Sequence, residues 1–192
     1  MQMDFFAQEA PPAPALQLQA HASGDYGPRT GENARGADVT VAFAVDFETA
    51  GERLTHRVAG PRYVGIALGS NVPKAADQLS AFMAKRNARS LNIAGNGIYT
   101  LATQGISQAE VNRWVFEVLS LVHKTRALTF IRSGGQTGVD TAGLVAGLAL
   151  GVPVLGLYPK GFRRRLRNQQ DVESSPQDLE AELRTAADAL LG

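Results

Sequence analysis

The stretch from Leu128 to Phe162 constrains the fold of this 192-residue chain more than any other. An apolar run leads into the glycine-rich segment SGGQTG at residues 133–138. A helix of small residues follows from Val139 to Leu150, and a second apolar run covers Val152 to Leu157. Strand, glycine turn, helix and strand in this order predict one βαβ unit of a parallel sheet. The turn would lie at the amino end of the helix, where unpaired backbone N–H groups and partial positive charge receive anions.

The same alternation extends toward the N-terminus. Apolar and capping patterns predict the following further elements: strands at 39–45, 63–68 and 91–94, and helices that end near Gly60, run over about 72–85, begin after Ser107 and cover 176–191. The predicted fold class is therefore α/β, a Rossmann-like parallel sheet flanked by helices, with an N-terminal strand-helix-strand extension. Residues 37–192 would form this single domain. Residues 1–36, rich in proline and glycine and without a period, predict a flexible N-terminal arm.

Composition excludes several classes of function. The chain has no cysteine, and its three histidines show no metal-ligand spacing, so we expect no metal site. A formal net charge of +1 gives no reason to expect nucleic-acid binding by the whole chain. No apolar run is long enough to span a membrane, and the first residues lack the basic start of a signal peptide. We therefore expect a cytoplasmic protein.

Two glycine loops follow predicted strands and would meet at the carboxyl edge of the sheet, where parallel sheets bind ligands. These loops and their surroundings give the candidate residues for a phosphate-bearing small molecule: Gly95, Asn96, Gly97, Arg132, Ser133, Gly134, Gly135, Gln136, Thr137, Gly138 and Lys160. Asn96 has a second interpretation, because asparagine tolerates left-handed turns. Arg132 also has a second interpretation, because it could form an ion pair with Asp140 instead of contacting a ligand. Lys160 opens a basic run to Arg167 that forms a solvated face or a flap over phosphate, with direct nucleic-acid binding as the third and weakest interpretation.

The segment SGGQTGVD, with the alanine- and glycine-rich helix and the sequence LGVPVLGLYPKG that follow it, resembles the molybdenum-carrier-like proteins of the SLOG superfamily. This superfamily of Rossmann-like nucleotide binders includes the lonely-guy phosphoribohydrolases and the DprA-like DNA-processing proteins. The resemblance covers residues 90–162. It implies that the loop 133–138 cradles a phosphate or another oxyanion, that the loop 95–97 is its neighbour, and that residues 159–161 close the pocket. It also implies a homodimer, for which the apolar helix 107–124 offers an interface.

The sequence thus predicts a protein that binds a nucleotide or nucleotide-derived phosphate ligand. One alternative is a nucleotide N-glycosidase of the phosphoribohydrolase type, with Asp140 and Glu52 as candidate catalytic carboxylates and Asp46 as a third. The glutamate-bearing PGGxGTxxE motif of the lonely-guy enzymes is not found here. Asp140 could instead organise the glycine loop, and Glu52 could be an ordinary helix-start charge. The other alternative is a carrier of molybdate or a similar oxyanion.

Overall fold

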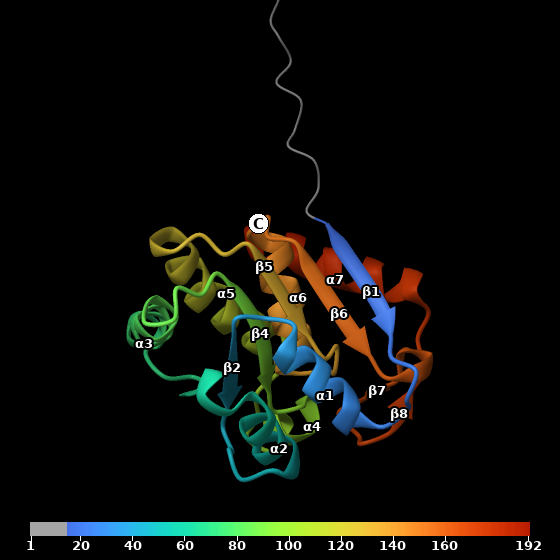
Figure 1. Ribbon diagram of the computed structural model, residues 1–192. Helices are drawn as coiled ribbons and strands as arrows, with labels where there is room; N and C mark the ends of the chain where they lie inside the picture. The colour runs from blue at the N-terminus through green and yellow to red at the C-terminus, as the bar shows by residue number, and fades with distance from the viewer. Residues whose placement is uncertain (1–14) are drawn as a thin grey trace, which may run out of the picture.

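The computed structural model describes residues 15–192 and contains a six-stranded parallel sheet with the strand order β1-β6-β5-β4-β2-β3 (Figure 1). All five strand pairs are parallel. The strands are β1 Leu16–Ala20, β2 Val39–Ala44, β3 Tyr63–Ala67, β4 Ser90–Gly95, β5 Phe130–Ser133 and β6 Val154–Tyr158. The α/β, Rossmann-like fold class predicted from the sequence is confirmed.

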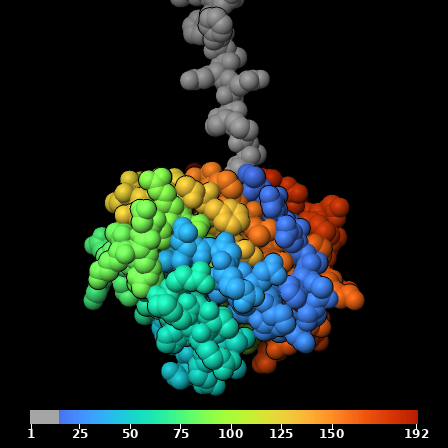
Figure 2. All heavy atoms as spheres, in the orientation of Figure 1, coloured from blue at the N-terminus to red at the C-terminus, as the bar shows by residue number. Residues whose placement is uncertain are grey.

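Helices cover both faces of the sheet. One layer consists of α1 Tyr26–Arg35 and α2 Ala50–Ala59, which lie side by side on the face turned to the viewer in Figures 1 and 2. The other layer consists of α3 Val72–Ala84, α5 Gln108–Thr125, α6 Val139–Ala149 and α7 Pro176–Leu191. Shorter elements complete the fold: α4 Ile98–Ala102, the 3-10 turns η1 Gly60–Arg62 and η2 Lys160–Phe162, and the hairpin of β7 Arg164–Arg165 and β8 Asp171–Val172.

Helix α6 packs directly against the strands at two glycines, Gly143 and Gly147. A Cβ added at Gly143 would meet the side chain of Ile93 on β4 at 2.6 Å, and one at Gly147 would meet Val154 on β6 at 2.3 Å. Larger side chains would push the helix outward. The small residues that follow the glycine loop therefore set the distance between α6 and the strands, and with it the position of the helix amino end.

The N-terminal segment differs from the sequence prediction. The flexible arm predicted for residues 1–36 is wrong for residues 16–35, which form β1 and α1. Strand β1 pairs with β6 from Leu16 to Ala20, so it forms one edge of the sheet. Tertiary contacts, of β1 with β6 and of α1 with α2, stabilise this segment although its local composition favours a loop. Residues 1–14 lie outside the described part of the chain.

Helix α5 supplies core residues to its own chain. Its predicted apolar stripe is fully buried against α6, α3 and α7: Val111, Val115, Val118, Leu119 and Val122. The stripe is therefore not available as an interface, which corrects that part of the dimer prediction. The dimer itself stays a prediction.

Over residues 15–192, no helix combines the length and the apolar character needed to cross a bilayer.

Candidate ligand-binding site

The two predicted glycine loops lie side by side at the carboxyl edge of the sheet. Gly97 and Gly138 form an isolated β-bridge, and the Val139 N–H donates to the Asn96 carbonyl at 3.2 Å. Gly138 has a φ of +95°, and a Cβ there would lie 2.5 Å from the Asn96 carbonyl oxygen. Only glycine allows this approach. The predicted adjacency of the loops is confirmed, and it holds the amino end of α6 against the end of β4.

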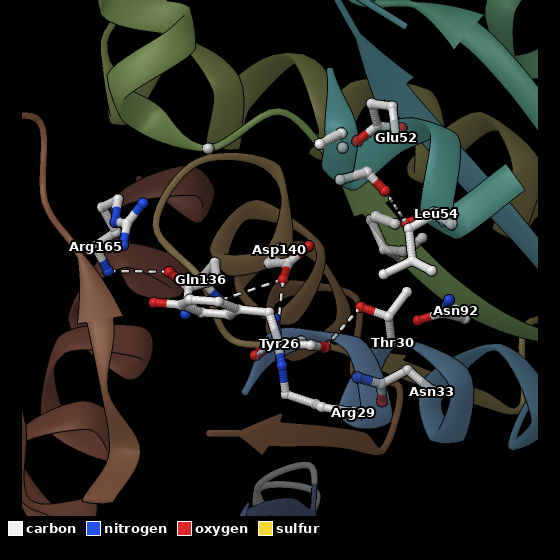
Figure 3. A pocket seen from close by; sticks show the side chains of 18 of the residues that line it. Tyr26, Arg29, Thr30, Asn33, Glu52, Leu54, Asn92, Gln136, Asp140 and Arg165 are labelled. Atoms are coloured by element: carbon white, nitrogen blue, oxygen red, sulfur yellow. Dashed lines mark hydrogen bonds and ion pairs between the residues drawn. The ribbon is translucent and has the colours of Figure 1, made fainter. Parts of the chain in front are cut away.

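A pocket of about 360 Å³ opens beside these loops, between α1, α2 and the carboxyl ends of β4 and β5 (Figure 3). It brings together residues from five separate parts of the chain. Its polar lining consists of Tyr26, Arg29, Thr30, Asn33, Glu52, Thr55, Asn92, Tyr99, Gln136, Asp140 and Arg165, and its apolar and glycine lining of Ala50, Gly51, Leu54, Ile93, Ala94, Gly95, Gly97 and Gly134.

A buried ion pair lies at the centre of the pocket. Arg29 Nη1 lies 3.7 Å from Asp140 Oδ2, and the two side chains are 6% and 13% exposed. Arg29 also donates to the Gly134 carbonyl, while its Nε has no hydrogen-bond partner among the described residues. Burial raises the pKa of Asp140 to about 6, against the opposing effects of Arg29 and of the Gln136 N–H, which donates to Oδ2 at 3.3 Å. Asp140 therefore both organises the glycine loop and faces the pocket.

Glu52 is the second carboxyl group of the pocket. It lies in the first turn of α2 and is 3% exposed. Its Oε2 has no hydrogen-bond partner within residues 15–192, and no ion pair there involves it. Burial, reinforced by the negative charges of Asp140 and Asp46, raises the pKa of Glu52 to about 8. At neutral pH this side chain is therefore mostly a neutral carboxylic acid.

The basic segment after β6 forms one wall of the pocket. Arg165 Nε and Nη2 donate to the two oxygens of Asp171 at 2.8 and 3.1 Å, which closes the β7–β8 hairpin. The guanidinium groups of Arg29, Arg163 and Arg165 lie 5.5–5.8 Å from the centre of the Tyr26 ring. Arg164 turns away and pairs with Glu182 on α7 at 2.8 Å. Within the basic run, Arg165 is thus the residue that lines the pocket.

Two side chains of the glycine loop hold this hairpin. Gln136 Nε2 donates to the Arg163 carbonyl at 3.1 Å, and its Oε1 accepts from the Arg165 N–H at 2.9 Å. The Thr137 hydroxyl donates to the Arg165 carbonyl. The loop and the hairpin are therefore one unit. The polar groups that the sequence analysis assigned to a ligand are in part used for this internal contact.

Of the predicted site residues, Glu52, Gly95, Gly97, Gly134, Gln136 and Asp140 line the pocket, whereas Asn96, Arg132, Ser133, Gly135, Thr137, Gly138 and Lys160 do not. The Asn96 amide binds the backbone of residues 45 and 46 through three hydrogen bonds. Arg132 is buried, lies against Gly36 and donates to Asn33 Oδ1 at 2.9 Å, which fastens α1 to the sheet.

The remaining predicted residues have other contacts. The Ser133 hydroxyl donates to the Ile93 carbonyl at 2.8 Å, across the β4–β5 pair. Gly135 has a φ of +72°, and a Cβ there would meet the Tyr158 ring at 2.5 Å. Lys160 is exposed at the start of η2. Its position, outside the pocket lining, differs from the prediction that it contacts the ligand.

The pocket residues that sequence reasoning missed come mainly from α1: Tyr26, Arg29, Thr30 and Asn33. Their spacing of i, i+3, i+4 and i+7 is that of one helix face. This spacing was the sequence signal that could have identified the helix and its pocket-facing residues. Three glycines and a proline among residues 24–31 concealed it, because that composition is typical of a loop. Proline is tolerated here because Pro28 lies in the first turn of α1.

Comparison with known protein families gives a match, which covers part of the site. The model of the circularly permutated YpsA SLOG family matches residues 131–171. This stretch runs from β5 through the glycine loop, α6 and β6 to the start of β8, so it includes both Asp140 and Arg165. A comparison with curated proteins finds no match. Across residues 15–192, no three histidine or acidic side chains gather in a way that could hold a metal ion.

Proposed function

The chain belongs to the SLOG superfamily, and from this premise we propose that the pocket binds a nucleotide or a nucleotide-derived phosphate ligand. The observation that carries the proposal is that two residues of the pocket lining, Arg29 and Glu52, each have a buried polar atom, Nε and Oε2 respectively, with no hydrogen-bond partner among the described residues. Leaving such groups unpaired costs about 1–3 kcal/mol each. A polar ligand in the pocket would remove that cost.

The phosphate of this ligand belongs at the end of the pocket formed by Gly134, Gln136 and Arg165. The amino end of α6 carries partial positive charge there. Arg165 uses two of its five N–H groups on Asp171, which leaves the others for an oxyanion. Tyr26 and Tyr99, both near enough to Arg165 to influence its pKa, add aromatic surface to the pocket lining. Arg29 neutralises Asp140, so that carboxylate does not repel the phosphate as a lone charge would.

A second candidate function is hydrolysis of the bond between base and sugar. It is favoured by the presence of both predicted carboxyl groups, Asp140 and Glu52, in one pocket with different pKa values of about 6 and about 8. At pH 7 such a pair supplies one ionised and one neutral carboxyl group, the combination that acid–base catalysis uses. Asp140 would stabilise positive charge at the anomeric carbon. An oxyanion carrier is the third reading, since the loop could hold molybdate alone.

Thermal-shift and calorimetric titration with nucleoside 5′-monophosphates, ADP-ribose, unphosphorylated nucleosides and molybdate tests this proposal. A ligand at a hundredfold excess over its Kd should stabilise the fold by roughly 2.7 kcal/mol. Arg165→Gln should weaken a nucleotide by about tenfold or more and leave the matching nucleoside unchanged. Arg167→Gln, in the same hairpin but outside the pocket lining, is the matched control. Equal losses in both variants would contradict the assignment of Arg165.

The mixtures are then analysed by chromatography for free base. An intact ligand after prolonged incubation supports a binding protein. Release of base that stops in Asp140→Asn, while the nucleotide still binds, supports the hydrolase. Stabilisation by molybdate but by no nucleotide would overturn the nucleotide proposal and favour the oxyanion carrier.

A further inference from the structure

Glu52 lies at the opposite end of the pocket from Arg165, with Asp140 between them in the view of Figure 3. The other pocket residues of α2 and β4 include two polar ones, Thr55 and Asn92, but their larger share is apolar: Ala50, Leu54, Ile93 and Ala94. If phosphate occupies the Arg165 end, the apolar end is left for the least polar part of a nucleotide. That part is the nucleobase.

The charged and titratable groups around Glu52 leave it without a positive partner. Asp140 on α6 and Asp46 after β2 both add negative charge, and the Tyr63 phenol on β3 has a pKa that burial and Glu52 together raise to about 12. Arg29 is committed to Asp140 and to the Gly134 carbonyl. The amino end of α2 favours a charged carboxylate, but burial opposes it and is the largest cause of the raised pKa of Glu52.

We propose that Glu52 is a specificity residue that recognises the nucleobase as a neutral carboxylic acid, by donating a hydrogen bond to a carbonyl oxygen or ring nitrogen on the base edge. The assignment rests on the proposed function, because it presumes a nucleotide with its phosphate at Arg165. A neutral carboxyl group has one O–H donor, whereas an ionised one only accepts. Glu52 lines the pocket, and its Oε2 has no hydrogen-bond partner among residues 15–192, so this oxygen is not committed to another group of the chain. The ligand class is thus a nucleotide whose base presents an acceptor.

Calorimetric titration with AMP, GMP, CMP and UMP, and with ribose 5-phosphate as the probe without a base, tests this assignment. Glu52→Ala should weaken the tightest nucleotide by about tenfold and leave ribose 5-phosphate unchanged, because only the base contact is lost. Glu52→Gln keeps an N–H donor and should stay within about threefold of the unchanged protein. Glu48→Gln, an exposed carboxyl just before α2, is the matched control and should have no effect.

The affinity should also depend on pH. Between pH 7 and 9 the binding of AMP or CMP to the unchanged protein should fall by about tenfold as Glu52 loses its proton, whereas Glu52→Gln should show no such fall. The ligand phosphate does not contribute, since its second ionisation is complete below this range.

A ligand-free measurement gives an independent check. The pKa of Glu52 is about 8 in the folded chain and 4.5 without the fold, so above pH 4.5 the unfolded state loses this proton first. The midpoint of thermal unfolding should therefore fall as pH rises from 5 to 8, and it should fall less in Glu52→Gln. Identical pH dependence in both proteins would mean that Glu52 is ionised in the folded state, which overturns the proposal.

Other outcomes also decide against it. A loss in Glu52→Gln as large as in Glu52→Ala, or an equal loss for ribose 5-phosphate, would exclude a donor contact to the base. Binding that is lost in Arg165→Gln but untouched by Glu52→Ala would overturn this inference alone. If neither the four nucleotides nor ADP-ribose binds the unchanged protein, the proposed function fails and the inference fails with it.

Discussion

The glycine loop 133–138 and helix α1 contribute to the same pocket in opposite ways. The loop is the most conspicuous feature of the sequence, yet Gly134 and Gln136 are its only pocket-lining residues. Helix α1 lies in a stretch whose glycine and proline content is typical of a loop, yet four of its ten residues line the pocket. The loop positions the backbone at the amino end of α6, whereas α1 contributes side chains to the pocket lining. A motif can therefore mark the place of a site while the groups that contact a ligand come from elsewhere in the chain.

The largest expected effect comes from the α1 side of this comparison. Arg29→Met would leave Asp140 buried without its positive partner and should destabilise the fold by about 3–5 kcal/mol. Equilibrium denaturation measures this. Arg53→Met removes the exposed pair of Arg53 with Glu48 and should cost at most about 1 kcal/mol. Adding Asp140→Asn should recover part of the loss in Arg29→Met; no recovery would show that Arg29 stabilises through packing instead.

A smaller effect is expected on the loop side. Gly138→Ala would combine a φ of +95° with a Cβ only 2.5 Å from the Asn96 carbonyl, and should cost about 2–4 kcal/mol. Gly151 has a φ of +72° but open space around it, so Gly151→Ala isolates the backbone penalty of about 1 kcal/mol. Thermal unfolding compares the two variants. Equal losses would indicate that backbone conformation alone, and not the contact between the glycine loops, requires glycine at position 138.

The smallest effect concerns the contact between the loop and the basic hairpin. Gln136→Ala removes both side-chain hydrogen bonds to the hairpin backbone and should cost about 1–2 kcal/mol. Amide hydrogen exchange should rise selectively in residues 163–172, because the hairpin loses its attachment to α6. Gln78→Ala, on the exposed surface of α3, is the control and should leave hydrogen exchange in residues 163–172 unchanged. Unaltered exchange in Gln136→Ala would mean that the remaining contacts, among them the Thr137 hydroxyl and the Arg164–Glu182 pair, hold the hairpin without Gln136.

Some of the candidate site was predictable because its chemistry is local. Glu52 and Asp140 were identified from their positions after strands and at helix starts, and both line the pocket. Other predictions could not distinguish a side chain that faces a ligand from one that holds the backbone. Asn96 and Arg132 have the residue types expected of ligand contacts, but their polar groups bind residues 45–46 and Asn33 instead. Partners that are distant in sequence decide between these uses.

The sequence by itself determined the α/β fold class and the place of the glycine loops, because apolar periodicity and glycine positions act over a few residues. It also determined that α6 lies close to the sheet, since Gly143 and Gly147 allow nothing bulkier. Only the tertiary structure decided that residues 16–35 complete the sheet and the pocket, and that Arg29 meets Asp140, 111 positions away in the chain. Burial and the approach of Asp140 and Asp46 are properties of the assembled fold, and together they raise the pKa of Glu52 to about 8, which local sequence could not reveal.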